Sequence, residues 1–173
     1  MSSTLNMQAD DFVLFGLSAQ FAQERSAIDA AWKLLQAQAH PDKFASQGAS
    51  AQRLAMQWSV RINEAYQRLK NPIQRAAYLC SLHGQAINAH SNTAMPSDFL
   101  MQQMEWREAL EDARGTQALE ALLDESASLQ KAALAKCAAL IDDSQDYAAA
   151  AQVVRQLLFV EKFIADVENA LAH

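Results

Sequence analysis

Two helical patterns meet at the stretch His40-Pro41-Asp42-Lys43-Phe44, and this stretch decides the fold of the first half of the chain. Apolar residues recur three and four positions apart over residues 27–39 before it and over residues 49–70 after it. Pro41 lacks a backbone N–H and biases His40 away from the helical region, so the first of these helices should end there. The pattern predicts an antiparallel helical hairpin with an imidazole and a carboxylate exposed at its tip.

Shorter helices are expected on either side of this hairpin and its loop, residues 40–48. The first covers residues 11–17, where Asp10 is suited to cap the helix. Its candidates for burial are Phe12, Phe15 and Leu17. After the hairpin, Asn71-Pro72 should end the long helix, and a short helix follows over residues 73–82. No segment of this half has the alternating pattern of a strand.

The second half of the chain predicts a separate helical module. Residues 85–97 are polar and rich in helix breakers, which favours a linker. Helices are expected over residues 99–113, 117–140 (with Thr116 as the cap) and 145–171. The last of them has an apolar seam formed by Val153, Leu157, Val160, Ile164, Val167 and Leu171. Three helices joined by short turns predict an antiparallel three-helix bundle, so the whole chain is expected to be all-α.

Composition narrows the classes of function. The chain has 173 residues, 51% of them hydrophobic, and a net charge of −6. Residues 1–83 carry eight basic and six acidic groups, a balance of +2, while residues 84–173 carry six and fourteen, a balance of −8. The first half therefore suits an acidic partner surface, and neither half is basic enough to favour nucleic acid. Without an apolar run of membrane length or a signal peptide, we expect a cytoplasmic protein with no membrane partner.

The sequence offers no constellation of catalytic residues. His40 and Asp42 are two positions apart across a proline, which is a poor arrangement for orienting a nucleophile, and no phosphate-binding glycine loop or zinc-protease motif is present. Cys80 and Cys137 each lie in a helical pattern and are expected to be buried apolar residues, not a disulfide or a metal pair. We expect no enzyme activity, no metal and no cofactor.

Several motifs around the tip resemble one family. Residues 11–17, Asp-Phe-Val-Leu-Phe-Gly-Leu, resemble the first-helix signature of the J-domain family. Residues 62–66, Ile-Asn-Glu-Ala-Tyr, and 69–72, Leu-Lys-Asn-Pro, resemble its third helix and the following turn. Residues 74–79, Gln-Arg-Ala-Ala-Tyr-Leu, and 82–84, Leu-His-Gly, resemble the HscB subfamily of J-protein co-chaperones, which serves iron–sulfur cluster assembly. The resemblance covers nearly the whole chain and favours the bacterial form.

This resemblance implies a first binding surface. In the family, the tip docks on a DnaK-class chaperone and promotes its ATP hydrolysis. The residues that match are His40, Pro41 and Asp42, with Lys43, Lys33 and Arg25 contributing electrostatic steering. Many J-domains carry an aromatic residue just before the histidine and several cations along the second helix, whereas this chain has Ala39 and only Lys33 well inside that helix. The departure favours a specialised, HscA-like partner.

A second surface follows from helical geometry. Over residues 99–113, Phe99, Trp106 and Leu110 fall on one core-facing stripe, since a helix advances about 100° per residue. Leu100, Met101 and Met104 lie outside it, which predicts either a binding patch or a bundle that buries a wider face. The HscB resemblance favours the patch and implies a scaffold-binding surface of Leu100, Met101, Met104, Glu105, Glu108 and Phe159. The scaffold implied is IscU, which carries the nascent iron–sulfur cluster.

Two other interpretations remain open at this point. The same bundle could deliver a different client to a DnaK-class chaperone, which binding to apo-IscU would distinguish. A metal-dependent enzyme that uses His40 and Asp42 would instead show turnover without any chaperone.

Overall fold

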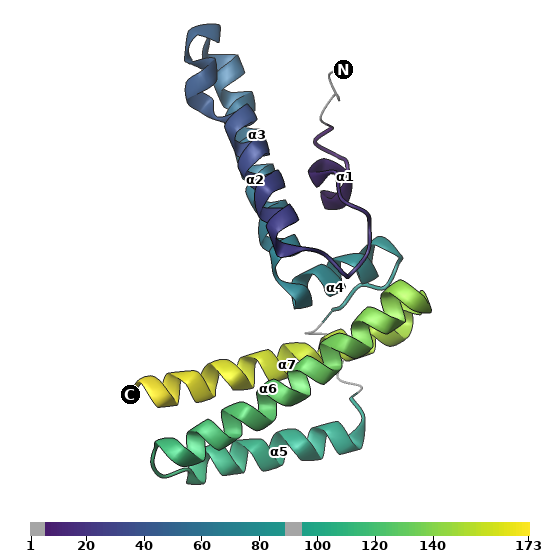
Figure 1. Cartoon of the computed structure of the whole chain (residues 1–173), viewed down its shortest axis with the longest axis vertical. Coiled ribbons are helices and arrows are strands. Elements are labelled where there is room, and N and C mark those ends of the chain that lie inside the picture. Colours follow the sequence, from purple (N-terminus) through teal and green to yellow (C-terminus); the bar gives the residue numbers. More distant parts are fainter. Residues whose placement is uncertain (1–5, 89–94) are drawn as a thin grey trace. The chain divides into compact units, whose positions relative to one another are not determined.

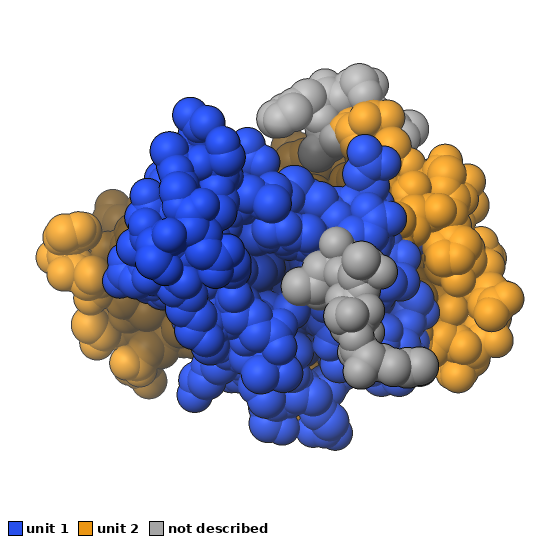
Figure 2. All heavy atoms as spheres, turned by 90° about the horizontal axis from the view of Figure 1, so that it is seen from above, with its two compact units in different colours: residues 1–79 blue, residues 80–173 orange. Residues whose placement is uncertain are grey.

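The structure, a computed structural model of the whole chain, describes residues 6–88 and 95–173. The chain divides into two compact units, residues 1–79 and residues 80–173 (Figure 2). Every regular element within the described ranges is helical, which confirms the all-α prediction. None of the helices in these ranges combines the length and the apolar character needed to cross a bilayer.

The first unit is built around a helical hairpin. Its elements are α1 (Asp11–Phe15), α2 (Arg25–Ala39), the 3₁₀ helix η1 (Pro41–Gln47), α3 (Ala49–Lys70) and the beginning of α4 (Pro72–Leu82). Helices α2 and α3 lie side by side with η1 at their closed end (Figure 1). The buried apolar residues on the facing sides of the two helices are Ile28, Leu35, Ala39, Ala55, Ile62, Ala65 and Leu69. The predicted hairpin is thus present, with the three- and four-residue spacing forming its core.

Polar contacts fix the register of the hairpin. The indole Nε1 of Trp32 and the amide Nε2 of Gln36 both donate to Oδ1 of Asn63, at 2.9 and 2.8 Å. The rings of Trp32 and Tyr66 stack with their centroids 4.7 Å apart. These contacts join the middle of α2 to the middle of α3, so a slip along the helix axis would break all of them together.

Helix α1 is anchored to α3 by a buried carboxylate. Asp11 is fully buried and accepts hydrogen bonds from Arg61 Nη1 at 2.8 Å and from Arg68 Nε and Nη2 at 2.6 and 2.9 Å. Arg61 also donates to the carbonyl oxygens of Met7 and Ala9. A buried charge is tolerated when it is paired and hydrogen-bonded in this way.

The ends of the elements show where the sequence-based boundaries need adjustment. Helix α1 ends at Phe15 because Gly16 adopts a left-handed conformation with φ of 66°, so Leu17 lies outside the helix and is only half-buried. The loop expected over residues 40–48 is mostly the 3₁₀ helix η1. Helix α4 begins at Pro72, one residue earlier than predicted, and Asn71 Oδ1 accepts from the backbone N–H groups of Ile73 and Gln74.

The second unit contains α5 (Ser97–Asp112), α6 (Thr116–Ala138), the π-helical turn η2 (Ala139–Asp143) and α7 (Tyr147–Ala172). Its core is the cluster Phe99, Trp106, Leu122, Val160, Phe163 and Val167. The rings of Trp106 and Phe163 stack at 5.0 Å, which joins α5 to α7. This is the predicted three-helix bundle, with Phe163 as a central residue that lies beside the predicted seam and was not part of it.

Two local predictions in this unit were wrong. Thr116 is the first residue of α6 and not its cap, because Gly115 occupies the N-cap position. Helix α6 also ends at Ala138, because the chain continues in a wider π-helical turn in which Ser144 N–H bonds to the carbonyl of Ala139. The expected linker, residues 85–97, includes residues 89–94, which lie outside the described residues. Its beginning is held by Arg155, which donates to the carbonyls of Ala86 and Ile87.

The buried carboxylate gives a test of the first unit. Replacing Asp11 by Asn should destabilise this unit by about 3 kcal/mol, because Arg61 and Arg68 then lose the charge that compensates their partial burial. Amide hydrogen exchange of α2 and α3 in the full chain reports this free energy. The matched control is Asp10→Asn, which removes the same charge one residue earlier and keeps a good N-cap. Equal, small effects of both substitutions would contradict the anchoring role of Asp11.

Candidate functional site

The tip of the hairpin owes its shape to the sequence His40-Pro41-Asp42. His40 ends α2 in an extended conformation, as expected for a residue that precedes proline, and Pro41 opens η1 where no N–H is needed. The imidazole Nδ1 of His40 accepts a hydrogen bond from the backbone N–H of Asp42 at 3.2 Å. The histidine therefore serves as the N-cap of η1, and the three residues form one compact turn.

This contact also determines what His40 can offer a partner. Because Nδ1 accepts the bond from Asp42 N–H, the neutral ring carries its proton on Nε2, which becomes a hydrogen-bond donor. The His40 side chain is 57% exposed and that of Asp42 is 91% exposed. The tip thus presents one donor and one carboxylate acceptor to solvent, in a geometry held by a short turn.

The backbone behind the tip is held as well. Ser59 Oγ on α3 donates to the carbonyl oxygen of Ala39, the last residue of α2, at 3.4 Å. Ala39 itself is buried against α3. With the Trp32 and Gln36 contacts further along the hairpin, these interactions place the tip on a rigid support, which suits a binding element that must keep one geometry.

The predicted steering cations fall into two groups. Lys43 lies in η1 beside His40 and Asp42, and its side chain is exposed. Lys33 is exposed on α2, whereas Arg25 is at the far end of that helix, about 20 Å away along the axis at 1.5 Å per residue. The tip residues and Lys43 thus come together, and the α2 cations lie apart from them.

Arg25 differs from the other predicted cations because it is already paired. Its Nε donates to Asp29 Oδ1 at 2.9 Å, and Tyr66 donates its hydroxyl to the same carboxylate oxygen at 2.8 Å. These bonds raise the pKa of Arg25 and lower the pKa of Asp29, with the mutual hydrogen bond as the largest cause of both shifts. The charge of Arg25 is therefore largely balanced by Asp29 within the first unit, and it is less available to a partner than the charge of an unpaired cation.

The second predicted surface is present on the bundle. Leu100, Met101, Met104 and Phe159 are exposed by 46%, 61%, 63% and 46%, so the bundle does not bury them. Phe99, Trp106 and the partly buried Leu110 face the core, as the helical geometry predicts. Of the two alternatives that the sequence left open, the exposed apolar patch is the one observed. Phe159 joins it from α7, where its ring makes a T-shaped contact with the Phe99 ring, with the two centroids 6.4 Å apart.

A groove runs between α5 and α7 at this patch and encloses about 610 Å³. It is lined by Leu100, Gln103, Met104, Arg107, Glu108, Phe159 and Lys162. Four predicted residues therefore share one groove, while Met101 and Glu105 are exposed on the same helix without lining it. These seven lining residues form the α5–α7 groove.

Sequence reasoning missed three of the residues in the α5–α7 groove. Gln103 and Arg107 follow Leu100 by three and seven positions, and Lys162 follows Phe159 by three, so helical spacing alone could have indicated them. Arg107 is bound to Asp166 at 2.6 Å and lies over the ring of Phe163. Within the described part of the chain, Gln103 Nε2 is buried without a hydrogen-bond partner. An unmet buried donor beside an apolar groove is what a partner's carbonyl group would satisfy.

The remaining candidates for chemistry are the cysteines. Cys80 and Cys137 are free and fully buried, which confirms the prediction of small core residues. Burial raises the pKa of the Cys80 thiol to about 11 and that of the Cys137 thiol to about 12. Within residues 6–88 and 95–173, no group of three or more His, Cys, Asp or Glu side chains is arranged to hold a metal ion.

Comparisons with known proteins point to one family. Residues 95–168 match the family described as the HSCB C-terminal oligomerisation domain. Over 166 residues, the chain is 48% identical to the co-chaperone protein HscB homolog of Burkholderia multivorans, with 94% of each chain covered. The corresponding protein of Burkholderia mallei is also 48% identical over the same coverage.

Two solved structures are similar to the chain as well. The chaperone HscB from Vibrio cholerae is 36% identical, with a TM-score of 0.82 over 94% of this chain and 97% of the other. The human co-chaperone protein HscB gives a TM-score of 0.91 at 22% identity, over 95% of this chain and 83% of the other. The human protein is thus alike in fold.

The two thiols provide a test of the packing in the second unit. At pH 8 a thiol with a pKa of about 11 is a thiolate in roughly one molecule in a thousand, so a disulfide reagent should leave both cysteines of the native protein unmodified. In urea, both should react within minutes. Because each thiol pKa is higher in the folded than in the unfolded protein, the stability of this unit should fall as the pH rises from about 9 toward 12. Rapid labelling of the native protein would contradict the observed burial.

Proposed function

This chain belongs to the HscB family of co-chaperones, and from that premise we propose that it stimulates the ATPase of an HscA-like, DnaK-class chaperone and delivers an IscU-type iron–sulfur scaffold to it. Residues 1–84 would form the J-domain that contacts the chaperone, residues 85–97 the linker, and residues 98–173 the scaffold-binding domain. The protein itself acts as an adaptor, with no catalytic residue and no cofactor of its own. We place it in the cytoplasm, with neither nucleic acid nor a membrane among its partners.

The observation that supports this proposal most directly is that each compact unit has its own exposed candidate surface for a partner. The first unit presents His40, Pro41 and Asp42 at the end of a rigid hairpin. The second presents the α5–α7 groove with its uncovered leucine, methionine and phenylalanine side chains. Two independent surfaces on one chain are what a protein needs in order to bring a client to a second protein.

The action of the tip on the chaperone follows from linkage. A partner can shift an equilibrium between two states only by binding one of them more tightly. His40 Nε2–H, the Asp42 carboxylate and the Lys43 ammonium offer the polar contacts by which the tip would favour the hydrolysis-competent state of the chaperone. Because the turn is pre-formed, little conformational entropy is lost when these contacts are made.

Recognition of the scaffold would depend on apolar anchors. Leu100, Met104 and Phe159 are the exposed apolar side chains of the α5–α7 groove, and methionine adapts well to the shape of a partner. Glu108 and Lys162 add one charge of each sign at the groove. Met101 and Glu105 extend the surface along α5. Apolar anchors surrounded by polar side chains are the usual arrangement of a protein–protein interface.

The experiment that tests the proposal is steady-state ATP hydrolysis by the HscA-like chaperone of the same organism. This protein and apo-IscU are added separately and together. Stimulation by this protein that rises further with apo-IscU would support both parts of the proposal. Stimulation that is indifferent to apo-IscU would leave the chaperone partner and assign the bundle to a different client. If neither this chaperone nor another of the DnaK class is stimulated, the proposal is wrong.

The tip gives a prediction for a single substitution. His40→Gln should reduce the stimulation of ATP hydrolysis about thirty-fold, as expected when a hot-spot contact of about 2 kcal/mol is removed. Scaffold binding, measured by isothermal titration calorimetry, should be unchanged. His173→Gln is the matched control, because it makes the same change at an exposed site at the end of α7. A parallel loss of both activities in His40→Gln, with the fold intact, would refute two separate surfaces.

The groove gives the reverse prediction. Leu100→Ala combined with Met104→Ala should weaken scaffold binding about a hundred-fold, since about 3 kcal/mol of apolar contact is removed. Stimulation of the chaperone without scaffold should stay at the wild-type level. The control is the pair Leu34→Ala and Met56→Ala, which are similarly exposed, at 61% and 57%, on the first unit. Equal weakening by the control pair would contradict a specific role for the groove.

A further inference from the structure

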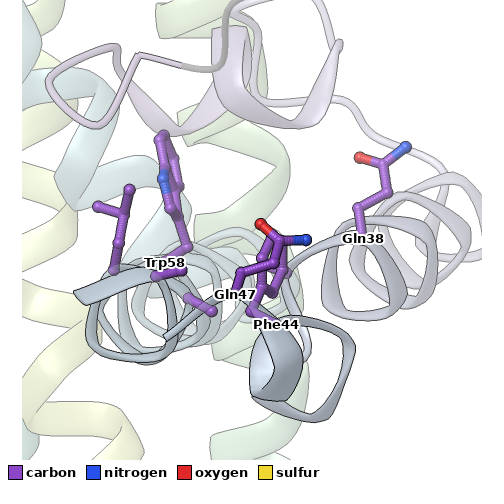
Figure 3. A pocket seen from close by; sticks show the side chains of 8 residues that line it. Gln38, Phe44, Gln47 and Trp58 are labelled. Atoms are coloured by element: carbon purple, nitrogen blue, oxygen red, sulfur yellow. The ribbon is translucent and has the colours of Figure 1, made fainter. Parts of the chain in front are cut away.

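An apolar pocket of about 300 Å³ lies beside the tip, between the end of α2, η1 and α3. It is lined by Gln38, Ala39, Phe44, Gln47, Ala51, Leu54, Ala55 and Trp58. Figure 3 shows Gln38 and Trp58 on opposite sides, with Phe44 and Gln47 between them. These eight residues form the tip pocket.

The tip pocket exists because three of its lining residues are alanines. Ala39 comes from α2, and Ala51 and Ala55 come from successive turns of α3. Their methyl groups leave space that the larger walls, Phe44, Leu54 and Trp58, do not close. Leu54 remains 52% exposed beside this space. Protein interiors are normally packed to a density that leaves few voids of this size, so an open apolar pocket at the surface is available for a ligand group.

The position of the pocket identifies what can fill it. Ala39 directly precedes His40, and Phe44 follows Asp42 by two residues, so the pocket is continuous with the surface that the tip presents. Residues 30–60 carry three basic groups and one acidic group, Asp42, which favours an acidic partner surface. A protein bound to the tip would therefore cover the opening of the pocket. Its surface around that opening would be negatively charged, to complement the basic groups of the hairpin.

We propose that the tip pocket receives one apolar side chain from the acidic surface of the chaperone that binds the tip. This inference rests on the proposed function and adds the anchor that determines which chaperone fits. Cavities of about 150 Å³ already hold a benzene ring, so the pocket has room for a side chain as large as phenylalanine. The pocket is also pre-formed, since Ser59 fixes the backbone of Ala39 at its edge.

An anchor of this kind fits the charge distribution on the hairpin. Arg25 is bound to Asp29, which leaves Lys43 at the tip and Lys33 further along α2 as the cations without an ion pair among the described residues predicted to bind the chaperone. Two exposed charges contribute more to the rate of association than to the lifetime of a complex. A buried apolar contact at the tip pocket would lengthen the lifetime of the complex. It would also restrict binding to chaperones with a side chain that fits the space beside Ala39.

The first test compares two exposed leucines of the hairpin. Leu54→Ala opens one wall of the tip pocket, whereas Leu34→Ala removes a leucine that is 61% exposed on α2 and does not line it. The concentration of this protein that gives half-maximal ATPase stimulation is measured with the HscA-like chaperone. We expect it to rise about ten-fold for Leu54→Ala and less than two-fold for Leu34→Ala, in line with the loss of one interface anchor. Equal values for the two variants would overturn the proposal.

The second test fills the pocket. Ala51 is half-buried on α3, and Ala51→Leu places an apolar side chain in the space that the chaperone would use. We expect thermal unfolding of the free protein to shift upward by a few degrees, because the void is filled. The half-maximal concentration for stimulation should meanwhile rise about ten-fold. A variant that is more stable and equally active would overturn the proposal, because an empty packing defect would behave in that way.

These experiments distinguish a failure of the tip-pocket proposal from a failure of the proposed function. If the wild-type protein stimulates no DnaK-class chaperone, the function itself is wrong. If the wild type stimulates and His40→Gln does not, while Leu54→Ala and Ala51→Leu both match the wild type, only the tip pocket is refuted. A change confined to self-association of the protein in sedimentation experiments would assign the pocket to a second copy of this chain and would also refute the proposal.

Discussion

The first unit depends on one buried carboxylate. Asp11 has no contact with solvent and is held by three hydrogen bonds from Arg61 and Arg68, at 2.6 to 2.9 Å. Removing such a charge from water costs several kcal/mol, so the arrangement is favourable only when all of its donors are in place. Because the donors are seven residues apart on α3, they fix α1 along two turns of that helix. Tyr78 of α4 accepts the backbone N–H of the same aspartate, which brings a third element to this point.

The function proposed for the tip depends on the fixed packing of the helices in the first unit. At the closed end of the hairpin, η1 packs against α3 but fully buries none of its own residues. Rigidity there comes from the stacked Trp32 and Tyr66 rings and from the shared acceptor Asn63, which set the register of α2 against α3. The tip can thus present donor and acceptor groups in one fixed arrangement while the side chains of His40 and Asp42 remain exposed to solvent. A flexible loop with the same residues would lose part of its binding free energy to ordering.

Much of this arrangement could be predicted from the sequence, because helical periodicity and proline chemistry act locally. The bounds of α3 and the end of α2 follow from residues within one turn of them, and the exposure of Leu100 and Met104 follows from their angle on α5. Contacts between distant segments could not be predicted in this way. The burial of Asp11 requires arginines fifty and fifty-seven residues away, and a charged residue alone gives no sign that it is paired.

The tip pocket and the α5–α7 groove share a physical principle. In each, a helical pair leaves apolar side chains uncovered next to a feature that the free protein does not satisfy: a void beside Ala39 in the first, and the buried amide of Gln103 in the second. Better packing at either place would stabilise the free protein. It would also remove the free energy that becomes available when a partner fills the void or accepts the unmet hydrogen bond. Incomplete packing at these two positions is therefore consistent with surfaces that are completed only by binding.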